Sequence, residues 1–427
     1  MMIRLFLLLL GFIAYLPQAY AILTIEVTGG QEGGGQPIAI IPFGQQAGMP
    51  TPPQDIVGII SNDLYRTGRF SPLPIASLPS RPFEASQIDF PSWQAVGVPH
   101  IVIGRIAGGA TSGYTVEFEL FDTSGGRLAG LSYKATAGTL RQVAHQISDA
   151  IYKALTGQRG IFGTRIAYVT VKRGIKQSIY KLYIADADGA NPQMMLQSAE
   201  PIFSPSWSPD GRSITYVSLE GKHVAVYIQD VNTGKREKVA AWPGLNTAPS
   251  WSPDGSRLAL SLSKDGNPEI YILNLRNRGL TRLTYDPAID TEPSWSPDGQ
   301  AIVFTSDRSG GPQIYQMSAS GGNLRRLTFE GNYNTTAKFA PDGHKVVYLR
   351  GGSGYRIANL DIQNGESSII SRTSTDKSPS YAPNGSMIIY SNGGGLASIS
   401  ADGRVQQRLS VDNGEEVREP AWSPFSD

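Results

Sequence analysis

The sequence predicts an all-β six-bladed β-propeller preceded by a smaller α/β domain. The first observation is a phrase of seven residues, Pro-Ser-Trp-Ser-Pro-Asp-Gly, that occurs at 205–211, 249–255 and 293–299. The second is that looser copies of this phrase continue to the end of the chain. The third is that residues 22–160 contain no copy and instead alternate strand-like and helix-like patterns.

Each copy of the phrase carries an aromatic residue, and these aromatic residues recur at a nearly constant interval. They are Trp207, Trp251, Trp295, Phe339, Tyr381 and Trp422, which are separated by 44, 44, 44, 42 and 41 residues. Intervals of this length are typical of propellers and other repeat arrays.

Four strands can be assigned to each repeat. Pro-Asp-Gly and Pro-Asn-Gly are turn sequences, because proline presets φ, Asp or Asn caps the turn and glycine accepts a positive φ. Apolar or aromatic residues stand seven and nine positions after each of the first five repeat aromatics, which predicts a strand with one buried face. Tyr227, Tyr271 and Tyr315 indicate a third strand, and Leu283-Thr284 and Leu327-Thr328 a fourth. Four strands make one propeller blade.

The two ends of the array each supply part of one blade. Residues 165–169 and 182–184 match a second and a third strand, but no aromatic phrase precedes them. Residues 420–424 match a first strand with nothing after it. We therefore expect the C-terminal strand to complete this blade, which gives six blades over residues 161–427 and a closed ring without an open sheet edge.

The first residues predict a cleavable secretory signal peptide over 1–21. Arg4 gives a positive start, residues 5–16 form a short apolar core, and Ala19-Tyr20-Ala21 is a small-x-small cleavage site. This apolar core is shorter than the ~20 residues that span a bilayer, so a retained membrane anchor is the weaker alternative. Cleavage after Ala21 would leave a mature chain that begins at Ile22 and has no membrane-inserted segment.

Composition limits the class of partner. The chain has 37 basic and 36 acidic residues, and removing Arg4 with the signal peptide makes the formal net charge zero. No long basic run is present, which argues against a nucleic acid or another polyanion as partner. With 0 cysteines, the sequence excludes a disulfide framework and an acylated N-terminal cysteine. We expect a soluble monomer that is stabilised by its buried core.

Residues 22–160 are expected to form the α/β domain. Glycine-rich residues 29–35 precede a short buried strand at 37–43. The 3.6-residue apolar spacing predicts one helix over 54–67, with Gly68 as its stop, and a second over 140–155, with Gly157 as its stop. The remaining strands are expected at 100–106, 114–121 and 128–135, the last two joined as a hairpin. Residues 157–163 would lead into the propeller.

A search for catalytic and metal-binding patterns is mostly negative. The four histidines, His100, His145, His223 and His344, lack metal-ligand spacing and are expected to be structural or on the surface. Asp186-Ala187-Asp188-Gly189 begins like a calcium loop but lacks the later oxygen ligands, so a turn between strands is the better interpretation. No G-x-S-x-G nucleophile motif is present. We expect no catalytic residue, no bound metal and no cofactor.

The order of these phrases resembles one known family. Residues 164–169, 185–191, 205–211, 290–295, 312–315 and 418–424, together with Pro42-Phe43 and Leu155-Thr156-Gly157, look like those of the TolB family, the periplasmic component of the Tol-Pal system of Gram-negative bacteria. The resemblance implies a periplasmic binding protein, not an enzyme. Members bind the lipoprotein Pal through the propeller face at the loops before the repeat aromatics, and the C-terminal domain of TolA through the mature N-terminus. They support outer-membrane integrity and constriction at division, and colicins exploit the same propeller face.

Carried over by position, the resemblance implies two Pal-binding loops. Their residues are Leu245, Asn246, Thr247 and Ala248 in one loop and Asp290, Thr291 and Glu292 in the other. Leu245 departs from the family, which frequently has histidine there. Thr291 and Glu292 are the sharper candidates, because a strand does not require such polar residues before it.

The TolA-binding segment implied by the resemblance is Ile22, Leu23, Thr24, Ile25, Glu26 and Val27. Its alternation suits addition as a strand to the edge of a partner's sheet. An ordinary first strand or a frayed terminus remains the alternative, since the glycines after it would let it dock or detach.

Two other classes of function stay open at this stage. A propeller enzyme would need clustered carboxylates or histidines in the central channel, and the scattered histidines argue against it. A propeller that binds cell-wall carbohydrate should expose aromatic residues on one face, whereas the repeat aromatics are better explained as core residues.

Overall fold

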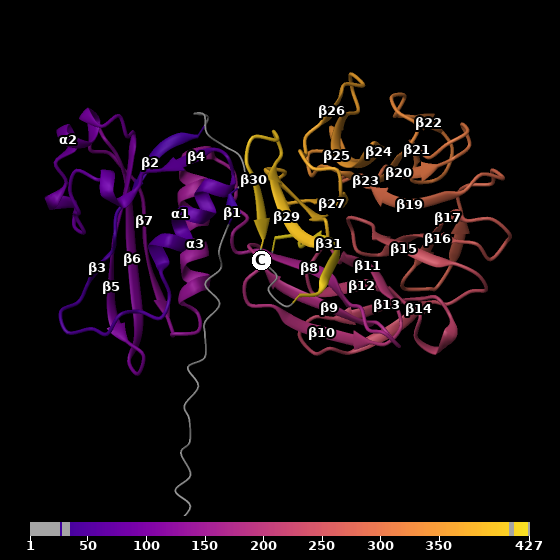
Figure 1. Ribbon diagram of the computed structural model, residues 1–427, viewed down its shortest axis with the longest axis horizontal. Coiled ribbons are helices and arrows are strands. Elements are labelled where there is room, and N and C mark those ends of the chain that lie inside the picture. The colour runs from indigo at the N-terminus through magenta and orange to yellow at the C-terminus, as the bar shows by residue number, and fades with distance from the viewer. Residues whose placement is uncertain (1–25, 28–34, 410–413, 426–427) are drawn as a thin grey trace, which may run out of the picture.

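The computed structural model describes residues 26–27, 35–409 and 414–425, so the signal peptide predicted at 1–21 lies outside the described residues. Figure 1 shows two parts side by side: an α/β domain in indigo and purple, and a ring of small sheets that runs from magenta to yellow. A search of the described helices for one long and apolar enough to cross a membrane found none.

The α/β domain is one sheet with helices on both faces. Its strands are β2 (Gln36–Ile40), β3 (Gly44–Gln45), β4 (Phe70–Pro72), β5 (His100–Gly109), β6 (Gly113–Asp122) and β7 (Arg127–Ala135). Its helices are α1 (Ile56–Arg66), α2 (Phe90–Ala95) and α3 (Leu140–Thr156), with 3₁₀ turns at Ile75–Ser77 and Ala85–Gln87. The strand order is β4-β2-β5-β6-β7, with β3 beside β5. Strand β2 is parallel to β4 and β5, and β5, β6 and β7 are antiparallel.

Both predicted helices of this domain are confirmed, and local signals set their ends. The side chain of Asp55 caps α1 by accepting a hydrogen bond from the backbone N–H of Gly58 at 2.9 Å. Helix α3 ends at Gly157, whose φ of 74° is the left-handed conformation that a C-terminal glycine supplies. The apolar faces of α1 and α3 pack on one face of the sheet, and Trp93 of α2 packs on the other. The short elements β3, β4 and α2 were not predicted.

The propeller has six blades of four antiparallel strands, numbered here from the first complete one. Blades 1 and 2 are β11 (Ile202–Trp207), β12 (Ser213–Ser218), β13 (Ala225–Asp230) and β14 (Arg236–Ala240), then β15 (Asn246–Trp251), β16 (Arg257–Leu262), β17 (Glu269–Asn274) and β18 (Leu280–Arg282). Blades 3 and 4 are β19 (Asp290–Trp295), β20 (Ala301–Ser306), β21 (Gln313–Ser318) and β22 (Arg325–Arg326), then β23 (Asn334–Phe339), β24 (Lys345–Gly352), β25 (Gly354–Asp361) and β26 (Ser367–Ile369). Blade 5 is β27 (Asp376–Tyr381), β28 (Met387–Asn392), β29 (Gly395–Ser400) and β30 (Gln406–Leu409). A 3₁₀ turn, Glu220–Lys222, lies between β12 and β13.

Blade 6 is built from both ends of the array, as predicted. Strand β31 (Glu416–Trp422) pairs with β8 (Arg165–Lys172), which is followed by β9 (Ile179–Asp186) and β10 (Gln193–Ser198). Trp422 stands opposite Ile166, and its indole N–H donates to Thr164 Oγ1 at 2.8 Å. The ring is therefore closed by main-chain pairing between residues about 250 positions apart.

The repeated phrase forms the turn that its residue types predict. Gly255 has a φ of 69°, and Asp254 Oδ1 accepts hydrogen bonds from Ser252 Oγ at 2.5 Å and from the backbone N–H of Ser256 at 3.0 Å. The Ser252 bond and the Ser256 bond lower the pKa of Asp254 to about 2. The corresponding glycines of the other complete repeats, Gly211, Gly299, Gly343 and Gly385, also have positive φ values.

The two domains share one core. Apolar side chains of α1 and α3 form a single cluster with residues 161–162 of the linker and with buried side chains of blades 5 and 6, among them Ile166 and Trp422. The backbone N–H groups of Phe162 and Gly163 donate to the carboxylate of Asp149 on α3, at 2.8 and 3.1 Å. The linker is thus packed and hydrogen-bonded between the two domains.

Candidate functional site: the loop face, the channel and the N-terminal strand

One face of the propeller is formed by the loops that enter the innermost strands. In an antiparallel four-stranded blade, the loop before the first strand and the loop between the second and third strands lie at the same end. Several large apolar side chains are exposed in these loops or at the strand end beside them: Leu245 at 44 %, Tyr285 at 72 %, Ile289 at 49 %, Phe329 at 74 %, and Tyr355 at the start of β25 at 37 %. Apolar side chains gathered on one face are typical of a protein interaction surface.

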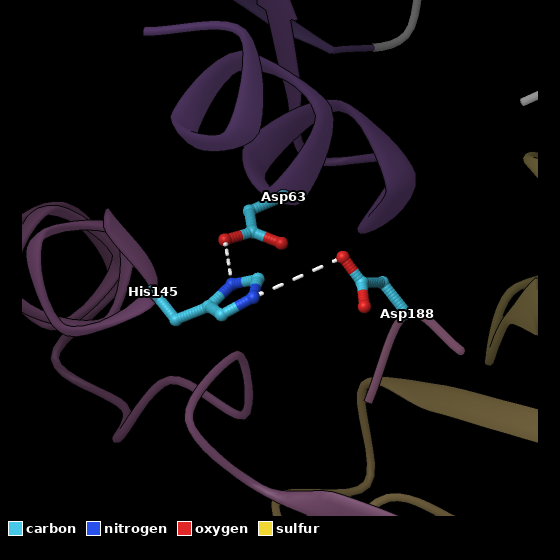
Figure 2. A group of neighbouring side chains, drawn as sticks. All are labelled: Asp63, His145 and Asp188. Carbon is cyan, nitrogen blue, oxygen red and sulfur yellow. Dashed lines mark hydrogen bonds and ion pairs between the residues drawn. The ribbon is translucent and has the colours of Figure 1, made fainter. Parts of the chain in front are cut away.

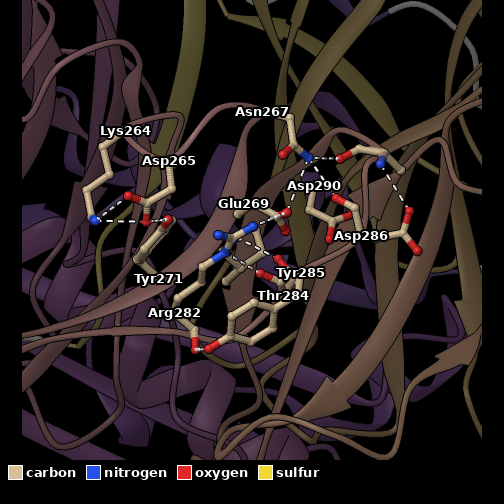
Figure 3. Close-up of polar contacts among 12 residues, drawn as sticks. Lys264, Asp265, Asn267, Glu269, Tyr271, Arg282, Thr284, Tyr285, Asp286 and Asp290 are labelled. Carbon is tan, nitrogen blue, oxygen red and sulfur yellow. Dashed lines mark hydrogen bonds and ion pairs between the residues drawn. The ribbon is translucent and has the colours of Figure 1, made fainter.

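The loop of residues 283–289, before β19, is held firmly by polar contacts (Figure 3). Asn267 Nδ2 donates to the backbone carbonyls of Asp286 and Ala288, at 2.7 and 2.6 Å. The buried carboxylate of Glu269 accepts from Asn267 at 3.2 Å and pairs with Arg282 at 2.7 Å. These contacts fix the loop backbone, so Tyr285 and Ile289 are presented on a preorganised surface.

The first predicted Pal-binding loop contains residues with different surroundings. Leu245 is exposed, and its backbone N–H donates to Ser263 Oγ at 2.8 Å. The side chain of Asn246 is fully buried, and it exchanges hydrogen bonds with the backbone of Trp242 at 2.9 and 2.7 Å. Thr247 and Ala248 are half-buried. Asn246 therefore shapes the loop, while Leu245 offers the accessible apolar side chain.

The second predicted loop shows the same division. Asp290 is fully buried and pairs with the guanidinium of Arg308 at 2.7 and 2.9 Å. Thr291 and Glu292 are half-buried, and both line a cavity of about 420 Å³ together with Tyr333 and Tyr355. Asp290 stabilises the loop, whereas Thr291 and Glu292 lie where a bound partner would reach them.

Glu292 also has a structural role that the sequence did not reveal. Its carboxylate accepts hydrogen bonds from the backbone N–H and the hydroxyl of Thr336 in blade 4, at 2.8 and 3.0 Å, and from Thr305 Oγ1 at 2.9 Å. The carboxylate thus connects two neighbouring blades. The expectation that such a polar residue serves no purpose in building the strand was incomplete.

The position of Glu292 recurs in every blade. One residue of each innermost strand has a positive φ although it is not glycine, and each lies at an irregularity in the pairing with the next strand: Ser204, Ala248, Glu292, Thr336, Ser378 and Glu419. All six line the central channel, a cavity of about 580 Å³. Left-handed backbone at a non-glycine residue is strained, and its repetition in all six blades shows that these six residues are a regular feature of the fold.

Charges in the channel are few and lie close together. Burial raises the pKa of Glu419, which also accepts a hydrogen bond from the backbone N–H of Ser204 in blade 1. Burial lowers the pKa of Lys338, an effect that Glu292 and Glu419 partly offset. Because Glu292 and Glu419 both accept hydrogen bonds from a neighbouring blade, these channel carboxylates help to hold the blades together.

The repeat aromatics line the same channel, which refines the expectation that they are core residues. Trp207, Trp295 and Trp422 are buried, whereas Trp251 is half-buried. The indole N–H of Trp251 donates to the backbone carbonyl of Ser206 in the preceding blade at 3.3 Å. These rings pack between blades with one edge toward the channel.

The N-terminal strand β1 (Glu26–Val27) lies on the propeller and not on the α/β domain. It pairs antiparallel with β30, the outermost strand of blade 5, with Glu26 opposite Arg408 and Val27 opposite Gln407. Strand β1 is therefore a fifth strand of that blade, positioned between the two domains (Figure 1). Ile22, Leu23, Thr24 and Ile25 of the predicted TolA-binding segment lie outside the described residues.

Sequence reasoning missed the apolar side chains of the loop face, Tyr285, Ile289, Phe329 and Tyr355. Their signal was present, since each is a large apolar residue within two positions of a proline or glycine, the residue types that mark turns. The resemblance placed the loops before the repeat aromatics on one face, but the sequence did not show which of their apolar side chains are exposed there.

Two family models match the chain. The TolB amino-terminal domain matches residues 23–129, and the TolB beta propeller domain matches residues 152–426. The chain is 60 % identical over 417 residues to the Tol-Pal system protein TolB of Nitrosococcus oceani, covering 96 % of this chain and 95 % of that protein. It is 58 % identical over 416 residues to the protein of the same name from Thioalkalivibrio sulfidiphilus, with 96 % and 95 % covered. The crystal structure of TolB from Acinetobacter baumannii superposes with a TM-score of 0.85 at 41 % identity, covering 94 % of this chain and 100 % of that one.

Proposed function

Because this chain belongs to the TolB family of Tol-Pal system proteins, we propose that it is a non-enzymatic periplasmic adaptor that binds Pal and TolA. The signal peptide of residues 1–21 directs its export, with cleavage after Ala21. In this role it supports outer-membrane integrity and constriction at cell division, and colicins would use the same face as Pal.

The observation that carries this proposal is the loop face of the propeller. Its exposed apolar side chains stand on loops whose backbones are fixed by buried pairs such as Arg282 with Glu269 and Arg308 with Asp290. A rigid apolar surface binds a folded partner with little loss of conformational entropy. Pal would cover Leu245, Thr291 and the surrounding exposed side chains, and Asn246 and Asp290 would act only by shaping the loops.

The channel supports a binding function over a catalytic one. Its two carboxylates, Glu292 and Glu419, accept hydrogen bonds from neighbouring blades. No histidine lines the channel within the described residues. Glu292 accepts from Thr336 and Thr305, and Glu419 accepts from Ser204, so both carboxylates have a structural role in joining blades.

The N-terminal strand supports the proposed TolA interaction. Residues 22–27 would add to the sheet edge of TolA through main-chain hydrogen bonds. In this structure Glu26 and Val27 already use such bonds on β30. Binding to TolA would therefore compete with docking on blade 5, and any coupling to Pal requires that Pal change the free energy of that docking.

The test is calorimetric titration of residues 22–427 with the periplasmic domain of Pal from the same organism. Its variant is Tyr285→Ala combined with Phe329→Ala, two side chains that are 72 % and 74 % exposed on the loop face. The matched control is Leu324→Ala, which is 46 % exposed in the turn between β21 and β22 at the opposite end of the blade.

We expect one-to-one binding that the double variant weakens by about 2 kcal/mol or more and that the control leaves unchanged. Equal weakening by the control would remove the loop face from the proposal. Absence of binding by the unmodified chain would contradict the adaptor function itself.

A further inference from the structure

A buried cluster of charged side chains lies where the α/β domain meets blade 6. Figure 2 shows His145 of α3 between two carboxylates, Asp63 of α1 and Asp188 of the turn after β9. His145 Nδ1 is 2.7 Å from Asp63 Oδ2, and His145 Nε2 is 3.8 Å from Asp188 Oδ2. The three side chains are only 3 %, 2 % and 9 % exposed. One imidazole ring thus faces an acid from each domain.

Two arginines complete the cluster. Arg66 of α1 pairs with Asp63 at 3.3 Å and donates to the backbone carbonyl of Ala187 at 2.9 Å. Arg141 of α3 contacts Asp188 and lies 3.4 Å from Asp186. The turn of residues 186–189 lies between β9 and β10, as predicted, and the backbone N–H of Gly189 donates to the carbonyl of Asp186. Side chains of both helices bind this turn.

The charge count favours a proton on His145. Asp63, Asp186 and Asp188 contribute three carboxylates, and Arg66 and Arg141 contribute two guanidinium groups. A protonated His145 supplies the third positive charge. Only the doubly protonated imidazole has N–H groups to direct at both carboxylates, whereas a neutral ring would direct a lone pair at one of them.

The arrangement favours a proton over a metal ion, although three potential ligands meet here. Nδ1 is already at hydrogen-bond distance from Asp63. The Oδ2 atom of Asp188 that faces Nε2 is also the atom that Arg141 contacts. A cation between Nε2 and Asp188 would therefore meet the guanidinium group of Arg141, and charge repulsion disfavours it.

We propose that protonated His145 locks the α/β domain to blade 6 by bridging Asp63 and Asp188, and that loss of this proton loosens the domain junction. The lock adds to three other connections between the two parts: the apolar cluster that α1 and α3 share with blades 5 and 6, the hydrogen-bonded linker after α3, and the pairing of β1 with β30. The lock acts at a site remote from the loop face and does not depend on what that face binds.

The direction of the pH dependence follows from the surroundings of His145. Burial acts to lower the pKa of His145, but Asp63 and Asp188 outweigh both burial and Arg66, and the pKa is raised above 6.5. A raised pKa means that the lock is fully present below about 6.5 and is lost as the pH rises through the folded-state value. One linked proton changes the opening equilibrium by at most about tenfold per pH unit.

Asp149 is a second titrating group beside the junction. Burial raises its pKa from 3.8 to about 6, although the hydrogen bonds that it accepts from two backbone N–H groups and the charge of His145 act to lower it. Burial and the charge of Asp188 also raise the pKa of Asp186, although the charges of His145 and Arg141 act to lower it. His145→Gln replaces the imidazole with a side chain that does not titrate, so the pH dependence that persists in this variant belongs to these carboxylates.

The test measures amide hydrogen exchange at the junction between pH 5.5 and 8.5, corrected for the intrinsic exchange rate. Peptides that contain residues 161–164 and 186–190 report on the junction, and β20 in blade 3 is the internal reference. The variants are His145→Gln and, as control, His223→Gln, which replaces an exposed histidine.

We expect junction protection in the unmodified chain and in the control to fall by up to about tenfold per pH unit above pH 6.5, with β20 unchanged. His145→Gln should abolish this fall above pH 6.5. The same fall in His145→Gln, or no fall in the unmodified chain, would overturn the proposal.

A second measurement needs no variant at position 145. Histidine Cε1 resonances of the protein are assigned by replacing His100, His223 and His344 one at a time, which leaves His145. Its titration midpoint should lie above 6.5 and coincide with the midpoint of junction exchange. A midpoint below 6.5, or no titration between pH 5 and 9, would contradict the lock even if His145→Gln does not fold.

Discussion

At the scale of single residues, the structure gives Glu292 two roles that the sequence could not separate. The side chain lies on the face where a partner would bind, yet its carboxylate accepts three hydrogen bonds from Thr305 and Thr336. Replacing a residue of this kind tests binding and stability together. Thr291, which also lines the cavity beside the loop face, is the cleaner probe of binding.

The stability role of Glu292 leads to a prediction. Glu292→Gln removes one of the two carboxylate oxygens that accept from Thr336, and a charged acceptor is worth about 1.5–3 kcal/mol. We expect a loss of about 1–3 kcal/mol in the free energy of unfolding, measured by urea denaturation. Glu237→Gln is the control, because Glu237 is 64 % exposed and its pair with Arg278 should contribute less than about 1 kcal/mol. Equal effects of the two substitutions would show that the bond between blades does not stabilise the ring.

At the scale of elements, β31 decides whether the propeller is closed. Trp422 is buried, stands opposite Ile166 and donates to Thr164. Trp422→Ala should cost about 3–5 kcal/mol, because it removes a large buried ring. Trp251→Ala should cost less, because that ring is half-buried at the channel. Thermal unfolding of the two variants measures the difference in stability. Equal losses would argue that the shared blade contributes no more to stability than another blade does.

The N-terminal strand allows a second prediction at this scale. Within the residues that the structure describes, strand β1 covers the edge of β30 through two residue pairs. Deleting residues 22–34 should therefore expose that edge and raise amide exchange in residues 406–409, while β28 in the same blade keeps its protection. The overall unfolding temperature should change little. Unchanged exchange in residues 406–409 would mean that β1 does not remain docked in solution.

At the scale of the whole molecule, the two domains are packed together as one unit. A single apolar cluster runs from α1 and α3 through residues 161–162 into blades 5 and 6. We expect calorimetry to show one unfolding transition, with a van't Hoff enthalpy close to the calorimetric enthalpy. Two resolved transitions would show that the shared core does not couple the domains. The buried pairs of the junction, with Asp63 and His145 at their centre, should sharpen that coupling at low pH.

The sequence by itself determined the repeating unit, the number of blades and the shared blade. The repeating unit depends on local chemistry, namely turn residues, strand alternation and the interval between aromatic residues, and it can be recognised within about 45 residues of chain. The number of blades and the shared blade then follow from counting the repeats and from the incomplete repeat at each end of the array. The helices of the α/β domain were equally local, whereas β4 and α2 are too short to give a periodic signal.

Only the tertiary structure decided which side chains meet. Asp63, His145 and Asp188 are separated by 82 and 43 positions, and no spacing rule connects them. The same is true of Glu292 and Thr336, and of the apolar side chains on the loop face. Such contacts are set by how the ring closes and how the α/β domain packs on it. Burial then gives ordinary residues their properties, since a carboxylate or an imidazole removed from water must find its partners within the protein.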